Sequence, residues 1–165
     1  MFTKVLSSEK PILSFHICGN DLYTLSGRSV SHFELATGKA IHTKELFTKD
    51  GLSRKLLCDG QFIYSKDFCT FSILDAHSLS VIFRCELGDN LSSDICDLCQ
   101  DRTHVYASLR GGGLAIINKA RHEVLKIMVT DHSLWCIEAD KRHIYGGGVN
   151  GRFFVLDKNT LLQRL

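Results

Sequence analysis

Short apolar runs separated by polar turns recur along the whole chain, and one position recurs with them. Four segments share the order aliphatic residue, tyrosine, then small or polar residues, and all four tyrosines of the chain occupy this position: Tyr23, Tyr64, Tyr106 and Tyr145. Successive tyrosines lie 41, 42 and 39 residues apart. A period near 40 residues is the length of four short strands with their turns. The pattern therefore predicts four structural repeats.

Each repeat continues with the same further features. An apolar stretch ends at a carboxylate or amide 11 or 12 residues after the tyrosine, at Glu34, Asp75, Asn118 and Asp157, and a turn follows. Apolar and polar residues alternate ahead of this position, as Phe71, Ser72 and Ile73 do, which is the period of a β-strand. No window of 11 or more residues has a clean helical stripe.

The sequence therefore predicts an all-β chain of about four sheets, each with four short antiparallel strands, in one domain over residues 1–165. In the last repeat, Leu161–Leu165 is expected to form the fourth strand, and residues 2–6 are expected to form an additional strand. The repeat units run roughly over 11–46, 54–87, 94–129 and 133–165.

Three segments resemble the repeats of β-propeller families. Cys58–Ser65 resembles the first two strands of a WD repeat, and Ile144–Asp157 is similar to the second and third strands of quinoprotein-like repeats. Phe33–Ala40 is similar to the turn that follows in the quinoprotein-like family. The resemblance covers nearly the whole chain and implies a β-propeller-type array of about four blades. No repeat ends in Trp-Asp and the tryptophan-docking motifs of quinoprotein dehydrogenases are absent, so the resemblance does not carry quinone chemistry over.

The number of repeats bears on how the chain assembles. Propellers typically contain 4–8 blades, so four units are at the lower limit. A strand at 2–6 has no blade to complete if the fourth unit holds its own last strand. The favoured interpretation is a partial propeller, whose open strand edges and apolar blade face favour self-association or pairing with another propeller segment. A closed four-bladed ring and a different β architecture are the alternatives.

Composition and charge limit the classes of protein further. The 165 residues are 44% hydrophobic and 23% charged, with a formal net charge of +2. This is ordinary globular usage, and it gives no global field for a nucleic acid or a membrane surface. No apolar run is long enough to span a bilayer, and residues 1–10 lack the apolar region of a signal peptide. The seven cysteines are an odd number, so we expect reduced thiols and an intracellular, cytoplasmic protein, with the nucleus left open.

Sequence patterns for metal binding or catalysis are missing. Cys96 and Cys99 form a lone C-x-x-C pair, and alternation along a strand would put these two side chains on opposite faces. Cys18, Cys58 and Cys99 are predicted to share one small core position at the end of the first strand of each repeat, with Ala139 in the fourth. We therefore expect no metal, no cofactor and no enzyme activity.

One basic residue lies near the connection between the second and third strands of every repeat: Arg28, Lys66, Arg110 and Arg152. In a propeller these connections share one face, so the four side chains would form a basic arc on it. An acidic peptide, a phosphate group or RNA could bind there through charge-assisted hydrogen bonds. The alternative is ordinary solvated loop charge, because aspartates lie nearby.

The function that the sequence favours is a non-enzymatic scaffold whose loop faces bind protein partners. The alternative is a subunit that binds RNA, a ribonucleoprotein or another anionic ligand through the basic arc. An enzyme or cofactor-binding propeller has less support, because Asp67 is the only carboxylate in the connections between second and third strands. The pattern names neither the partner nor the number of blades in the assembled state.

Overall fold

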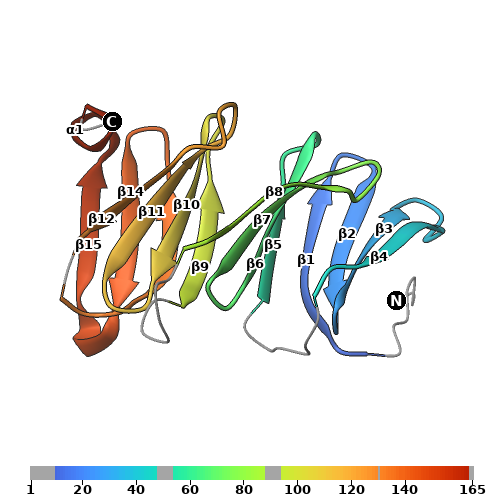
Figure 1. Ribbon diagram of the computed structural model, residues 1–165, viewed down its shortest axis with the longest axis horizontal. Coiled ribbons are helices and arrows are strands. Elements are labelled where there is room, and N and C mark those ends of the chain that lie inside the picture. The colour runs from blue at the N-terminus through green and yellow to red at the C-terminus, as the bar shows by residue number, and fades with distance from the viewer. Residues whose placement is uncertain (1–9, 48–53, 88–93, 130, 164–165) are drawn as a thin grey trace. The chain divides into compact units, whose positions relative to one another are not determined.

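In a computed structural model of the chain, the described residues are 10–47, 54–87, 94–129 and 131–163, and they form four antiparallel sheets (Figure 1). In every sheet each strand pairs with the next strand along the chain. The first sheet contains β1 (Ile12–Cys18), β2 (Asp21–Ser26), β3 (Ser29–Glu34) and β4 (Ala40–Glu45), and the second contains β5 (Arg54–Cys58), β6 (Phe62–Asp67), β7 (Thr70–Asp75) and β8 (Val81–Glu86). The third sheet contains β9 (Ile95–Gln100), β10 (His104–Leu109), β11 (Gly113–Asn118) and β12 (Val124–Met128). The fourth sheet contains β13 (Leu134–Ala139), β14 (His143–Gly148) and β15 (Phe153–Asp157). The prediction of an all-β chain of antiparallel sheets is confirmed. The strand predicted at residues 2–6 lies outside the described residues.

The fourth sheet differs from the prediction, because the chain forms a short helix where a fourth strand was expected at Leu161–Leu165. After β15 comes α1 (Lys158–Leu162). The Asp157 carboxylate accepts hydrogen bonds from the backbone N–H groups of Asn159 and Thr160, at 2.9 and 3.2 Å. This cap satisfies N–H groups at the start of the helix.

The other three repeats use the same position to reverse the chain. The Asp75 carboxylate accepts hydrogen bonds from the next turn, and so does the Asn118 side-chain oxygen. The residue four positions after the turn-forming residue then adopts a left-handed backbone conformation, at Gly38, Leu79 and His122. A left-handed residue stops helix propagation and turns the chain back into an antiparallel strand. In the fourth repeat the equivalent residue, Leu161, continues the helix instead.

Contacts divide the chain into two compact units, which are described separately. The first unit comprises Met1–Asp67 and Phe71–Arg84 and holds the first sheet with most of the second. The second unit comprises Phe68–Thr70 and Cys85–Leu165 and holds the third and fourth sheets. Within the described residues, no helix is long and apolar enough to cross a membrane.

The four tyrosines occupy equivalent places, as predicted. Each is the third residue of the second strand of its sheet: Tyr23 in β2, Tyr64 in β6, Tyr106 in β10 and Tyr145 in β14. Three of them donate a hydrogen bond to an aspartate five residues earlier, at O–O distances of 2.6 to 2.7 Å: Tyr64 to Asp59, Tyr106 to Asp101 and Tyr145 to Asp140. In the first repeat that position is Cys18, and Tyr23 instead stacks on His32 with ring centroids 4.6 Å apart.

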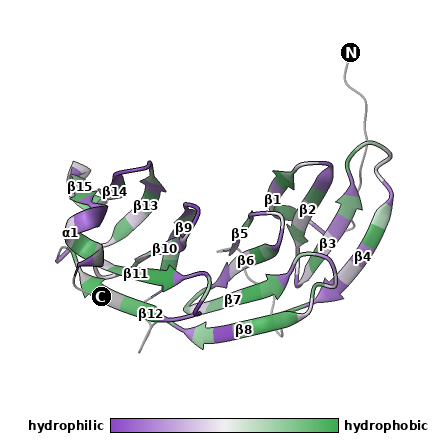
Figure 2. Ribbon diagram, turned by 90° about the horizontal axis from the view of Figure 1, so that it is seen from above, coloured by the Kyte–Doolittle hydropathy of each residue, from purple (hydrophilic) through white to green (hydrophobic). Residues whose placement is uncertain are grey.

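Each unit has an apolar core between its two sheets. In the first unit, Tyr23 and Leu25 of the first sheet pack with Leu56, Ile63 and Leu74 of the second. In the second unit, Tyr106, Leu114 and Ile116 pack with Ile137, Ile144 and Leu161. Figure 2 shows hydrophobic residues along the central strands β7 and β11. Packing of sheet on sheet therefore stabilises each unit, in agreement with the apolar alternation of the sequence.

The three cysteines predicted to share one repeat position do not share it. Cys18 is paired with Asp21, Cys58 with Ile63, and Cys99 with Tyr106, so their distances from the repeat tyrosine differ. Successive residues of a strand point to opposite faces. A shift of one residue therefore changes the side of the sheet on which the thiol lies, and that part of the sequence alignment is wrong.

Candidate functional site

Three of the four predicted basic residues lie in connections between strands, and one does not. Arg28 lies between β2 and β3, Arg110 between β10 and β11, and Arg152 directly before β15. Lys66 belongs to β6, which continues to Asp67, and only 3% of Lys66 is exposed. The prediction that Lys66 is an exposed loop residue is wrong. It lies two residues after Tyr64, on the same buried side of the strand.

Each of the three arginines has a carboxylate partner. Arg28 pairs with Glu45 on β4. In the second unit, Arg110 lies 3.5 Å from Asp94 and Arg152 lies 4.0 Å from Asp131. All three guanidinium groups are exposed, so the pairs contribute little to stability. They do offset the positive charge that the basic arc was predicted to have.

The second unit combines two of these ion pairs with the single tryptophan. Trp135 lies at a bulge of β13, where the register shifts between Leu134 and Cys136, and it is 52% exposed. The Arg110 guanidinium carbon lies 5.9 Å from the centroid of the Trp135 ring, in a cation–π arrangement. The N–H group of Gly111 donates to Ser133 Oγ at 3.3 Å, which ties the turn after β10 to the start of β13.

We call this group the Trp135 surface: Asp94, Arg110, Asp131, Trp135 and Arg152. The sequence pattern pointed to both arginines as binding residues but not to the tryptophan. The one available signal was a large aromatic residue just after the polar segment Asp131-His132-Ser133. Trp135 and Arg110 lie in different repeats and meet because two neighbouring sheets pack together. The spacing of residues within one repeat therefore could not predict this contact.

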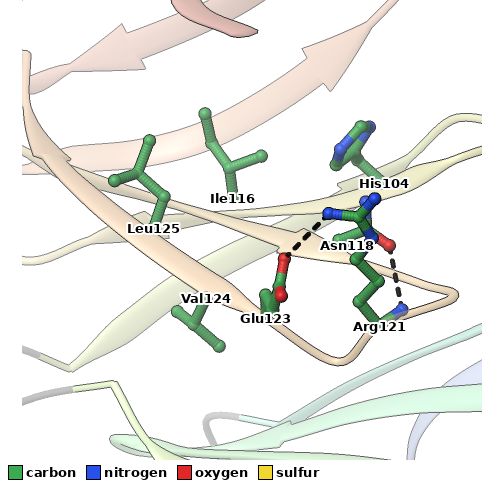
Figure 3. Close-up of a pocket in the computed structure, with 7 residues that line it drawn as sticks. All are labelled: His104, Ile116, Asn118, Arg121, Glu123, Val124 and Leu125. Carbon is green, nitrogen blue, oxygen red and sulfur yellow. Dashed lines mark hydrogen bonds and ion pairs between the residues drawn. The ribbon is translucent and has the colours of Figure 1, made fainter. Parts of the chain in front are cut away.

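A small pocket of about 230 Å³ lies elsewhere on the second unit (Figure 3). Its lining consists of three apolar residues, Ile116, Val124 and Leu125, and four polar residues, His104, Asn118, Arg121 and Glu123. The Asn118 side-chain oxygen accepts the backbone N–H of Arg121 at 3.0 Å, and the Arg121 guanidinium pairs with Glu123 at 3.7 Å. Burial lowers the pKa of His104, whose ring bonds Thr103 Oγ1 at 2.9 Å. These polar groups serve the turn between β11 and β12, so the pocket is the weaker candidate.

The strongest pKa shifts belong to the repeated tyrosine–aspartate pairs. Burial raises the pKa of Tyr64 and of Tyr106, and the hydrogen bond that each donates to its aspartate raises it further. Shifted pKa values often mark catalytic groups. Here the same pair recurs in three repeats, and Asp59 also accepts the backbone N–H groups of Gln61 and Phe62. These pairs therefore hold the turns between first and second strands.

Within the described parts of the chain, no group of three or more His, Cys, Asp or Glu side chains is placed to hold a metal ion.

Comparisons with known proteins place the fold. No protein-family model matches the sequence, and no curated protein matches it. Among solved structures, the computationally designed Ika4 protein superposes with a TM-score of 0.79 at 12% identity, covering 95% of this chain and 99% of Ika4. The fold is β-propeller-like. BamB from Moraxella catarrhalis gives a TM-score of 0.75 at 16% identity, and the WD40 repeats of RRP9 give 0.73 at 12%. This chain is covered to 94% in both cases but spans only about half of each, 52% of BamB and 53% of RRP9.

Proposed function

We propose that this chain is a non-enzymatic protein-interaction module that binds a protein partner through the Trp135 surface. The observation that carries the proposal is the half-exposed Trp135 ring under the Arg110 guanidinium. Tryptophan and arginine are the residue types most enriched among interface positions that dominate binding energy. A large exposed aromatic ring loses contact with water when a partner covers it, and this favours binding.

The two ion pairs of the Trp135 surface favour a protein partner of mixed charge over a polyanion. Arg110 and Arg152 are each paired with an aspartate, Asp94 and Asp131, so the Trp135 surface has as many negative as positive side chains. Binding to a nucleic acid gains affinity from unpaired basic groups that replace counterions on the phosphates. RNA is therefore the less favoured ligand. We place the module inside the cell, where the seven cysteines would remain reduced.

The proposal is tested by quantitative capture of partners from extracts of the source cells. Wild-type chain, Trp135→Ala and Arg110→Ala are compared with the matched control Arg121→Ala, an exposed arginine in a different turn, that between β11 and β12. We expect one set of proteins to fall at least about tenfold with the first two variants and to remain with the control. Equal capture by all four chains would contradict the proposal.

A second arm of the same experiment separates protein from RNA. Nuclease treatment and a salt titration from 50 to 200 mM are applied to the captured complexes. Capture that survives nuclease and changes little with salt supports a protein partner. Loss on nuclease treatment, or a fall of about a thousandfold or more over this range of salt, would assign the surface to a nucleic acid instead.

A further inference from the structure

Each unit shows which faces two neighbouring sheets use to pack on each other. In the first unit, the side of the first sheet that carries Tyr23 packs against the side of the second sheet that faces away from Tyr64. Tyr23 meets Leu56 and Ile63 there. In the second unit Tyr106 of the third sheet meets Ile137 and Ile144 of the fourth. We therefore distinguish two faces of a sheet. The tyrosine face carries the repeat tyrosine, and the receiving face, on the other side, is the kind that packs against the tyrosine face of the preceding sheet in each unit.

The receiving face of the first sheet is identified by strand register. In the second sheet, Leu56 lies opposite Ser65, the residue after the repeat tyrosine, and it is 1% exposed. The same register in the first sheet places Phe15 opposite Thr24 and Ile17 opposite Leu22. Phe15 is 64% exposed and Ile17 is 50% exposed. On the receiving face of the first sheet, β1 therefore exposes two apolar side chains, whereas their β2 partners Leu22 and Thr24 are buried.

The tyrosine face of the fourth sheet is uncovered in the same way. Its members follow from pairing: Val155 lies opposite Tyr145, as Ile116 lies opposite Tyr106 in the third sheet. Ile116 is 1% exposed, whereas Val155 is 53% exposed and the neighbouring Phe153 is 68% exposed. The Phe153 ring stacks on Tyr145 with centroids 6.1 Å apart. An aromatic and aliphatic surface thus occupies positions that are core in the third sheet.

We propose that the tyrosine face of the fourth sheet binds the receiving face of the first sheet of a second copy of this chain. Among the described residues, β1 of the first sheet exposes apolar side chains on the receiving face and β15 of the fourth sheet exposes them on the tyrosine face, and these are the two kinds of face that pack together inside each unit. Such a contact joins two different surfaces, so copies of the chain associate head to tail through it. The inference concerns faces separate from the Trp135 surface and does not depend on the proposed function.

The test is sedimentation of the full chain with one charged substitution on each face. Wild type is expected at twice the mass of one chain or more at about 20 μM. Phe15→Glu and Phe153→Glu are each expected to weaken association at least about 100-fold, because a carboxylate would be buried unpaired. Ile82→Glu on β8, at a site that is 44% exposed and outside both faces, is the matched control and should still associate.

Mixing the two variants distinguishes this contact from a contact between identical faces. Phe15→Glu keeps an intact fourth sheet and Phe153→Glu keeps an intact first sheet, so the mixture should form a two-chain species through one contact. Ile17→Lys and Val155→Lys repeat the design, and circular dichroism checks that each variant is folded. A monomeric wild type at about 100 μM would overturn the proposal, as would a mixture of folded variants that stays monomeric. So would a Phe15→Glu variant that associates as well as wild type.

Discussion

The ammonium group of Lys158 lies 2.6 Å from the carboxylate of Asp101 and joins the start of α1 to the turn between β9 and β10. The Lys158 side chain is buried, and its Nζ also donates to the Asp140 carbonyl oxygen at 2.6 Å. In the first unit the equivalent positions are Cys18 and Ala76, and both pack in the apolar cluster around Tyr23. Neighbouring sheets are thus joined by an ion pair in one unit and by an apolar contact in the other.

Removing the lysine should destabilise the fold. Burial by itself would raise the pKa of Asp101, but the hydrogen bonds from Lys158 and Tyr106 outweigh it and hold that pKa well below its usual range. Lys158→Met leaves the carboxylate partly buried without its cation, at a cost of about 1–3 kcal/mol in the free energy of unfolding. Urea denaturation measures the change, and the exposed Lys141→Met should stay within about 0.5 kcal/mol of wild type. If Lys158→Met is as stable as wild type, the ion pair contributes no net stability.

The contribution of each tyrosine hydroxyl to the free energy of unfolding should increase with the burial of its hydrogen bond. Tyr64→Phe and Tyr106→Phe each remove a donor to an aspartate, and we expect each to lower the free energy of unfolding by about 1–2 kcal/mol. Tyr145→Phe removes the same kind of hydrogen bond where that bond is exposed, so water can replace the hydroxyl and the effect should be smaller. Thermal and urea denaturation of the three variants give the order. An equal loss at all three sites would show that burial does not control this contribution.

The Asp140 carboxyl group should titrate at unusually low pH. The backbone N–H of His143, the Tyr145 hydroxyl and the backbone N–H of Arg142 all donate to it and lower its pKa to about 2. An unfolded aspartate titrates near 3.9, so the stabilisation from this group is present above about pH 4 and is lost as the pH falls through about 2. Carboxyl carbon NMR should show the low pKa, and Tyr145→Phe should raise it. An ordinary pKa in the wild-type chain would contradict the hydrogen-bond geometry.

Glycine substitutions at the two left-handed turn residues should have opposite effects. His122 and Leu79 have φ values of 57° and 55°, at equivalent positions of two turns. Glycine adopts this conformation without strain, so His122→Gly should be neutral or stabilise by up to about 1 kcal/mol. Leu79 is fully buried in the core of the first unit, and Leu79→Gly should cost about 3 kcal/mol or more through the cavity that it leaves. Denaturant midpoints of the two variants check the sign, and a large loss for His122→Gly would show that its ring stabilises the turn.

The sequence by itself determined the repeat, the strand order and the place of the four tyrosines. These features rest on local periodicity, because apolar alternation and turn residues specify a strand and its ends over a few neighbouring residues. The Asp59–Tyr64 separation of five residues was also visible in the sequence and recurs twice. Its hydrogen bond was not predicted, although both residues lie within one repeat.

Tertiary structure decided what each side chain touches. Lys66 is buried because β6 extends past it, and Trp135 meets Arg110 because two sheets pack together. The end of the fourth repeat is helical because Leu161 continues the helix where the other repeats have a left-handed residue. The cysteine alignment was wrong because a shift of one residue moves a side chain to the other face of a strand, and composition cannot reveal such a shift. Contacts between sheets join residues about 25 to 57 positions apart, as in Arg110–Trp135 and Lys158–Asp101. A pattern read within one repeat cannot specify them, since they depend on which faces of two sheets meet.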